Sequence, residues 1–333
     1  MNGMLEFIGG VAFFLFGMTV MSQGLQSFAG AGLSDKLARA CRTPLRGVVV
    51  GTLVTAAIQS SSATTVMVVG FVNAGVMSLN QAVGVIMGAN LGTTITAWLL
   101  SLSSLDGTPL LSLLHGKTLS PLAALVGVLL IMLSKEERKR QFGMSLAGLG
   151  VLFGGMETMS NTVAPLAENP QFGELLTFFE NPLAGVLVGA VLTAVLQSSS
   201  AAVGILQSFA ATGVIGVGLA VPVVMGQNIG TCATALLSSV GTEPNARRAA
   251  LSHLYFNMAG TLILLPVFLL LYRASIIPSL TLSEGGVALI HTVFNVLSTL
   301  ILLPASNLLL SLASRSVVDR DGKKAKKRRL FWH

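Results

Sequence analysis

Apolar residues dominate long, uninterrupted stretches of this chain. Residues 47–105 and 181–242 contain no Asp, Glu, Lys or Arg. A membrane-crossing helix needs about 20 mostly apolar residues, so each stretch has room for several crossings. The pattern predicts crossing helices near 5–28, 81–100, 110–133, 141–162, 218–239, 249–272 and 286–312.

Two further apolar segments are interrupted by polar residues. The motif Gln-Ser-Ser-Ser occupies 59–62 and recurs at 197–200. The apolar segment before the first motif, 47–58, is only about 12 residues long and too short to cross. We therefore predict re-entrant hairpins at 47–58 with 62–78, and again around 185–216, each turning at its motif.

The two motifs belong to a long internal repeat. Residues 51–101 align with 189–239 without a gap, and the same offset pairs Pro44 with Pro182. It also pairs Gly17 and Met18 with Gly155 and Met156. A repeat of this length suits half of a transporter better than a solenoid unit. The predicted division is 5–133 and 141–272, followed by a further helix at 286–312 and a basic tail at 313–333.

The charges of matching connections have opposite sign. Segment 30–46 carries four basic residues against Asp35, whereas the matching segment 168–184 carries three glutamates. Because basic loops stay in the cytoplasm, matching loops fall on opposite sides and the repeats are inverted. This places the N-terminus outside and the basic tail in the cytoplasm, in a plasma or inner membrane.

Composition agrees with an all-α multispanning membrane protein. Of 333 residues, 53% are hydrophobic and only 10% are charged, whereas a soluble domain carries roughly 25% charged residues. The net charge of +7 owes much to the tail. For that tail, contact with anionic lipid is favoured over nucleic-acid binding. The sequence leaves a homodimer open.

The serine-rich hairpin turns are the main candidates for ligand binding. Non-helical backbone at membrane depth is tolerated beside a cavity, and a helix that starts there offers free N–H groups to an anion. Serine hydroxyls can donate to an anion or ligate a small cation, and Gln offers both donors and acceptors. The alternative is that these small residues merely allow close helix packing.

Each hairpin is followed by a Gly-x-Asn-x-Gly-Thr sequence, at 88–93 and 226–231. Since Asn and Gly disfavour helix, we predict that both spans unwind there and expose carbonyls to a cation. Asn90, Asn228, Thr93 and Thr231 are the candidate site residues of these segments.

Few ionisable residues lie within the predicted spans. Glu157 is either functional or close enough to its span's end to reach water, and Lys117 either attracts an anion or extends to the interface. His253 with Asn257, like His291 with Asn295, shares one helical face, which favours hydrogen bonds between helices. The sequence has no G-x-S-x-G or H-E-x-x-H motif, so an enzyme is not expected.

Together, the two Gln-Ser-Ser-Ser motifs in inverted repeats and the following Gly-x-Asn-x-Gly-Thr sequences resemble the type II sodium–phosphate cotransporter family, as a bacterial member. The resemblance covers roughly residues 5–312. It implies sodium-coupled phosphate transport, with Na⁺ as coupling ion and no resident cofactor. The implied phosphate site comprises Ser60, Ser61, Ser62, Ser198, Ser199 and Ser200, with Asn90 and Asn228 as further candidates. The implied sodium site comprises Gln59, Gln197, Ser198, Ser199 and Thr234, with Thr93 and Thr231 as further candidates.

The first half departs from the family's His-x-x-Phe-Asn pattern, because the residues after His115 are Gly116 and Lys117. The number of sodium ions and the charge moved per cycle therefore stay open. Two other readings also stay open: a phosphate sensor without turnover, and the same fold carrying sulfate or arsenate.

Overall fold

The computed structural model describes residues 2–29, 40–41, 43–102, 116–165 and 181–317. Apart from one antiparallel bridge between Gly216 and Thr281, these residues form helices and turns. The helices of the first half are α1 (Asn2–Ala29), α3 (Pro44–Ile58), α4 (Ser61–Asn73), α5 (Leu79–Ser101) and α7 (Gly116–Leu133). Those of the second half are α8 (Glu137–Val163), α10 (Pro182–Leu196), α11 (Ser199–Ala210), α12 (Val217–Gly230), α13 (Cys232–Ser238) and α14 (Pro244–Arg273), followed by α15 (Glu284–Leu302) and α16 (Ser306–Ser316).

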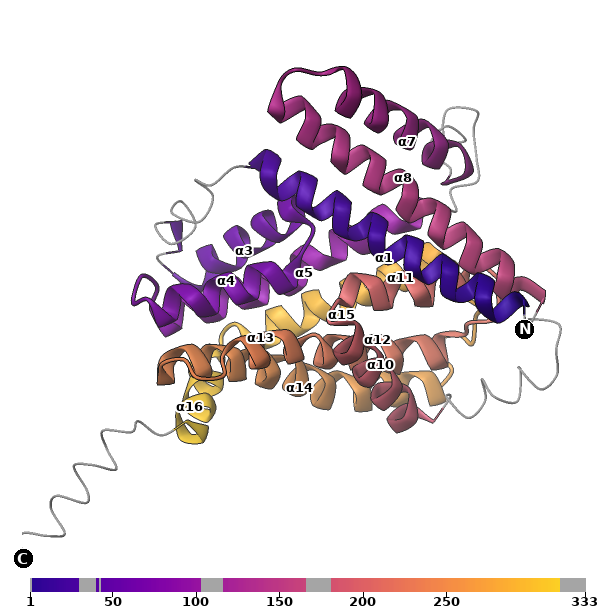
Figure 1. The fold of residues 1–333 in the computed structure, drawn as a ribbon. Coiled ribbons are helices and arrows are strands. Elements are labelled where there is room, and N and C mark those ends of the chain that lie inside the picture. Colours follow the sequence, from indigo (N-terminus) through magenta and orange to yellow (C-terminus); the bar gives the residue numbers. More distant parts are fainter. Residues whose placement is uncertain (1, 30–39, 42, 103–115, 166–180, 318–333) are drawn as a thin grey trace, which may run out of the picture.

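The two halves repeat one motif in opposite orientations. In each half a pair of short helices, α3 with α4 and α10 with α11, forms a hairpin that precedes a longer helix. Figure 1 shows the hairpins extending in opposite directions from a common centre. Equivalent residues start equivalent helices: proline opens α3 and α10, and a serine caps α4 and α11. The predicted all-α fold with inverted repeats and hairpins is confirmed.

The hairpin helices are too short to span a bilayer. They contain 15, 13, 15 and 12 residues, which at about 1.5 Å per residue gives roughly 20 Å, against about 30 Å of hydrocarbon. Within the described residues, six helices are long and apolar enough to cross, and α7, which is described from Gly116, is shorter. The sequence predicted seven crossings, of which α7 is the seventh.

The predicted unwinding of the first-half span is wrong, because α5 is helical throughout. Its glycines instead allow α3 to approach: a Cβ at Gly88 would lie 2.0 Å from the Val48 carbonyl oxygen. In the second half, a Cβ at Gly226 would lie 2.0 Å from the Val186 carbonyl oxygen. Small residues at such contacts are typical of helix packing in membranes. The second-half span is interrupted only at Thr231, whose φ and ψ stay right-handed helical.

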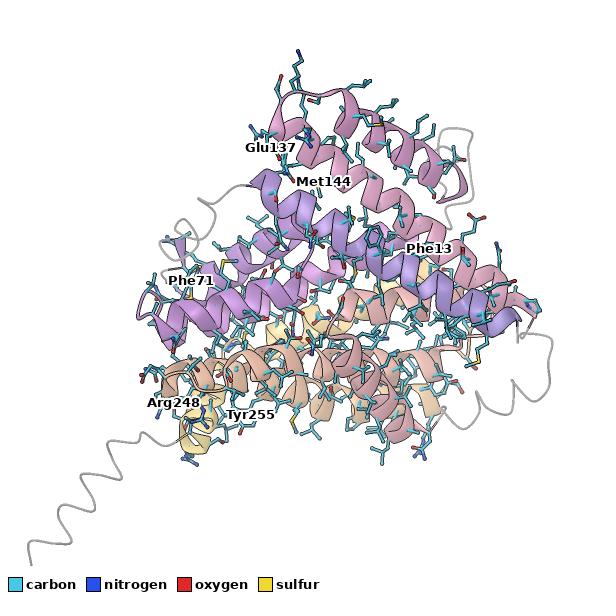
Figure 2. All side chains as sticks on the ribbon, viewed as in Figure 1. Phe13, Phe71, Glu137, Met144, Arg248 and Tyr255 are labelled. Carbon is cyan, nitrogen blue, oxygen red and sulfur yellow. The ribbon has the colours of Figure 1, made fainter. Side chains whose placement is uncertain are left out.

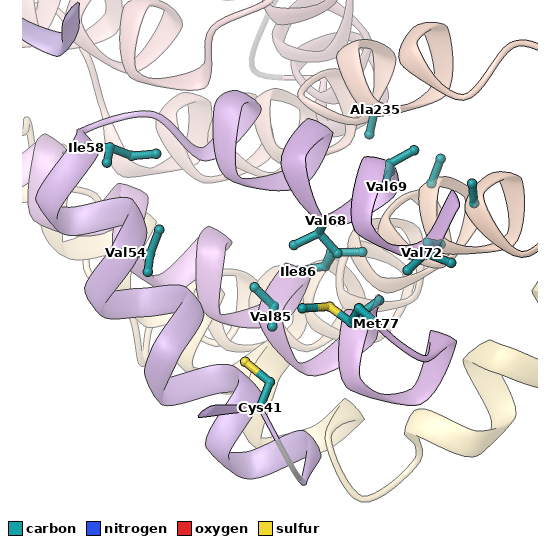
Figure 3. Packing of buried hydrophobic residues seen from close by; sticks show 14 residues of the cluster. Cys41, Val54, Ile58, Val68, Val69, Val72, Met77, Val85, Ile86 and Ala235 are labelled. Atoms are coloured by element: carbon teal, nitrogen blue, oxygen red, sulfur yellow. The ribbon is translucent and has the colours of Figure 1, made fainter. Parts of the chain in front are cut away.

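The first hairpin packs into a core that includes both halves (Figure 3). Val68 and Val72 of α4 lie against Val85 and Ile86 of α5, and Ala235 of α13 completes the same cluster. All five side chains are buried. The first hairpin is therefore held by its own span on one side and by the second repeat on the other.

The final span ends earlier than the sequence predicts. The helix expected over 286–312 stops at Leu302, and α16 starts at Ser306. Pro304 lies at the break, where its ring and missing N–H oppose helix continuation. Arg248 of α14 donates to the Val317 carbonyl at 3.2 and 2.8 Å, and Tyr255 lies 2.6 Å from the Ser316 hydroxyl. Figure 2 shows both side chains beside the end of α16, so α14 holds this helix in place.

Much of the charge that predicted the topology lies outside the described residues. This applies to 30–39, to 166–180 with Glu168 and Glu174, and to 318–333 of the tail. The placement of the two termini across the membrane therefore stays a prediction.

Candidate functional site at the hairpin tips

Each hairpin turns at the glutamine of its Gln-Ser-Ser-Ser motif. Gln59 and Gln197 have φ of 55° and 53°. These values lie in the left-handed region, which residues other than glycine rarely adopt. The next serine, Ser60 or Ser198, is extended and caps the following helix by accepting from the amide of Ala63 or Ala201 at 3.1 or 3.2 Å. Left-handed non-glycine residues are typical of functional sites.

The two tips line one cavity of about 310 Å³. All eight residues of the two motifs take part, and the remaining wall belongs to α1. The complete lining is Met18, Thr19, Ser22, Gln23, Gln26, Gln59, Ser60, Ser61, Ser62, Gln197, Ser198, Ser199 and Ser200. These described lining residues include polar side chains of both repeats and no ionised group.

Direct contacts join the tips to each other and to α1. The Ser62 hydroxyl donates to the Gln197 carbonyl at 3.2 Å, and Thr234 donates to the same oxygen at 3.5 Å. The Ser22 hydroxyl of α1 donates to the Gln59 carbonyl at 3.4 Å. These O···O distances exceed the usual 2.7–2.8 Å of a hydroxyl hydrogen bond, so the bonds are weak. The carbonyl and hydroxyl oxygens can therefore be recruited by a ligand at low cost.

Two polar atoms at the tips lack a protein partner. The Ser199 hydroxyl and the Gln59 side-chain oxygen are buried, and neither has a hydrogen-bond partner among the described residues. The Gln59 side-chain nitrogen donates to the Ala56 carbonyl at 2.5 Å. Since an unsatisfied buried polar atom costs about 1–3 kcal/mol, both atoms are suited to a bound ligand.

Asn90 and Asn228 do not line this cavity. The Asn90 amide donates to Asn257 at 2.8 Å, and its oxygen lies 3.1 Å from His253 Nε2. Asn257 also donates to Cys232 at 3.3 Å. Asn90 thus joins the two repeats, which is the helix-bridging role that the sequence favoured for His253 and Asn257. Asn228 donates to the Val224 carbonyl of its own helix at 2.9 Å.

Thr93 and Thr231 also lie away from the cavity lining. Each is buried and donates to a carbonyl of its own helix turn, Ala89 at 3.0 Å and Gln227 at 2.9 Å. Because α5 stays helical there, its carbonyls remain engaged in the helix and are not exposed to a cation. Of the sodium candidates outside the motifs, Thr234 alone contacts a tip.

Glu157 is not among the residues that line the cavity. Glu157 is half-buried on α8, at the position that the repeat pairs with Thr19. Lys117 starts α7, and its side chain lies outside the described residues.

The sequence analysis missed the contribution of α1. Thr19, Ser22, Gln23 and Gln26 are spaced i, i+3, i+4 and i+7, so they share one face of an otherwise apolar helix. That spacing was visible in the sequence. The internal repeat does not reproduce it, because Thr19, Gln23 and Gln26 match Glu157, Asn161 and Ala164.

Comparison with known proteins agrees with the duplicated architecture. The Na⁺/Pi-cotransporter family model matches twice, at residues 13–161 and 154–294. The chain is 33% identical over 264 residues to "Uncharacterized protein YqeW" of Bacillus subtilis, covering 79% of this chain and 82% of the relative. It is 30% identical over 264 residues to "Putative inorganic phosphate export protein YjbB" of Escherichia coli, covering 79% of this chain but only 46% of that relative.

A shorter similarity reaches an animal transporter. Over 116 residues the chain is 36% identical to "Sodium-dependent phosphate transport protein 2B" of Homo sapiens, covering 33% of this chain and 17% of that protein. No solved structure matches the chain. The two matches of the family model, one on each repeat, show that this multispanning membrane protein belongs to the Na⁺/Pi-cotransporter family.

Proposed function

We propose that this protein carries inorganic phosphate across the membrane together with Na⁺, and that both ligands bind in the cavity at the hairpin tips. The observation that carries the proposal is the meeting of the two Gln-Ser-Ser-Ser tips, from opposite orientations, in one polar cavity within an apolar protein. The names of the bacterial and animal relatives, which refer to phosphate export and sodium-dependent phosphate transport, support the choice of substrate.

Phosphate is suited to the helix starts at the tips. The first amides of α4 and α11, at Ser61, Ser62, Ser199 and Ser200, precede the first intrahelical hydrogen bonds and are free to donate. Two helix dipoles direct their positive ends to the same cavity, which favours an anion without a fixed positive charge. The unpartnered Ser199 hydroxyl adds a donor.

Sodium is suited to the oxygen atoms at the helix ends. The Gln197 carbonyl, at the C-cap of α10, lies 3.2 Å from the Ser62 hydroxyl and 3.5 Å from the Thr234 hydroxyl. Three neutral oxygens that converge in this way are the ligands a hard cation prefers, and helix C-terminal ends coordinate Na⁺ in other transporters. The Gln59 side-chain oxygen is a fourth candidate on the opposite tip. Asn90, Asn228, Thr93 and Thr231 are not included in this site.

We place the protein in a bacterial inner or plasma membrane. The loop charges favour an N-terminus outside and a basic tail in the cytoplasm. Movement of the repeats would expose the tips to each side in turn. The direction of net transport would then follow the phosphate and sodium gradients.

Uptake into proteoliposomes tests the proposal. Labelled phosphate should accumulate when a sodium gradient is imposed, and replacement of Na⁺ by K⁺ should abolish the accumulation. Ser199→Ala should greatly reduce uptake. Ser208→Ala on the same helix is the control and should not reduce it, because the buried Ser208 hydroxyl donates to the Gly204 carbonyl of its own helix. Uptake that ignores the sodium gradient would contradict the coupling.

Competition separates the remaining alternatives. Unlabelled phosphate should displace the label at lower concentration than sulfate does. Preference for sulfate would identify a different oxyanion as the substrate. Phosphate binding by the purified protein without flux would identify a sensor.

A further inference from the structure

The polar face of α1 continues the cavity away from the tips. Met18 accepts from the Ser198 hydroxyl at 3.8 Å, and Ser22 donates to the Gln59 carbonyl, so this part of α1 contacts both tips. Gln26 lines the same cavity one turn further along, about 6 Å beyond Ser22. The cavity therefore extends along α1 from the tips toward the C-terminal end of that helix.

Gln23 and Gln26 present exposed amides to this extension. Neither side chain has a described hydrogen bond, and the buried face of α1, with Phe14 and Met21, is directed to the core it shares with α8. An amide group offers two N–H donors, so the pair can donate to several phosphate oxygens. Among the described residues, no ionised side chain lines the cavity, so no described carboxylate competes for these donors.

We propose that Gln23 and Gln26 form a second binding station for phosphate, between the tips and the C-terminal end of α1. This inference rests on the proposed function, since it assumes that phosphate enters the tip cavity. Phosphate that leaves the serine hydroxyls would pass to the two amides before it reaches water.

The second repeat has no copy of this station. The positions of α8 that match Thr19 and Gln23 hold Glu157 and Asn161, and the position that matches Gln26 holds Ala164. Ser160, which matches Ser22, donates to the Ser208 carbonyl at 3.2 Å, away from the tips. The side chains of the station on α1 are therefore not repeated at the matching positions of the second repeat.

Protection of an introduced thiol tests the station without requiring transport. Gln23→Cys should react with a charged, membrane-impermeant thiol reagent, and inorganic phosphate should slow the reaction several-fold while chloride does not. Asn80→Cys is the matched control: Asn80 is exposed at the start of α5 and lies outside the cavity lining, so phosphate should not change its labelling. Both native cysteines are buried, and the parent protein supplies the background rate.

A second substitution separates direct binding from a distant conformational effect. Gln26→Glu, added to Gln23→Cys, should raise the phosphate concentration that gives half protection by at least about tenfold, because like charges this close repel. Gln26→Leu should raise it less. Equal protection in all three proteins, or no protection in any, would overturn the station.

The outcomes for the station and for the proposed function can be told apart. If the parent takes up phosphate but phosphate does not protect Gln23→Cys, the station is wrong and the proposed function stands. If phosphate protects Gln23→Cys, and Gln26→Glu weakens that protection, while the parent shows no uptake, the station stands and transport is wrong.

Discussion

Replacing Gly88 of α5 by alanine should push α3 of the first hairpin away from α5. The new Cβ would lie 2.0 Å from the Val48 carbonyl oxygen and 2.9 Å from the Thr52 nitrogen. Atoms of this kind do not approach within 3.0 Å, so α3 and α5 would have to move apart by about 1 Å. Such overpacking typically costs about 1–3 kcal/mol.

The same movement strains the contact that Thr52 makes across the pair. Its hydroxyl donates to the Val48 carbonyl at 2.8 Å and to the Gly88 carbonyl at 3.1 Å, and loss of the longer bond adds about 0.5 kcal/mol because the shorter one remains. Alanine's better helix propensity returns about 1 kcal/mol. We therefore expect Gly88→Ala to lower the free energy of unfolding by about 0.5–2.5 kcal/mol.

Gly70→Ala is the matched control, because a Cβ at that position of α4 meets no atom within 4 Å. It should leave stability unchanged or raise it by up to about 1 kcal/mol. Unfolding of the detergent-solubilised proteins, followed by circular dichroism against denaturant or temperature, measures both. If Gly88→Ala unfolds at the same midpoint as the parent, the close packing of α3 on α5 is not tight enough to matter and the reasoning fails.

Three further predictions concern single side chains. Ser199→Ala should remove an unpartnered hydroxyl, so stability should hold or rise while phosphate uptake falls; a large loss of stability would mean that the hydroxyl has a structural partner. Asn257→Ala should lower the free energy of unfolding by about 1–3 kcal/mol more than Asn295→Ala does. The reason is that Asn257 accepts from Asn90 of the other repeat, whereas Asn295 donates to a carbonyl of its own helix. Equal losses in a denaturation series would contradict this. Cys41 should react slowly with a maleimide at neutral pH and faster as pH rises, because burial raises the pKa of its thiol above its ordinary value and the thiolate is the reactive form; a rate equal to that of the unfolded chain would refute it.

The tips and the inversion of the repeats were accessible from the sequence because each half served as a comparison for the other. The recurrence of Gln59 and its serines at Gln197 identified the turns, and the opposite loop charges predicted that the repeats are inverted. The ends of the hairpin helices could be predicted in the same way, because equivalent prolines and serines start equivalent helices in the two halves.

The role of the Gly-x-Asn-x-Gly-Thr segments could not be predicted in the same way. A glycine can destabilise a helix, and it can also allow a neighbouring helix to approach closely. The sequence alone does not distinguish the two roles. The presence of the Val48 carbonyl against Gly88 decides between them, and that contact joins residues 40 positions apart. Likewise, Asn90 is occupied by His253 and Asn257 of the other repeat, a pairing that no local pattern indicates.

The left-handed backbone of Gln59 and Gln197 has a consequence for how the tips respond to selection. Glycine would adopt these angles without the steric cost of about 1–3 kcal/mol, and its greater entropy loss on folding, about 0.5–1 kcal/mol, would offset only part of that gain. A library screened for thermal resistance should therefore enrich glycine at both positions. The same library screened for phosphate-dependent growth should retain glutamine, so the difference between the two screens would report directly what each tip contributes to ligand binding.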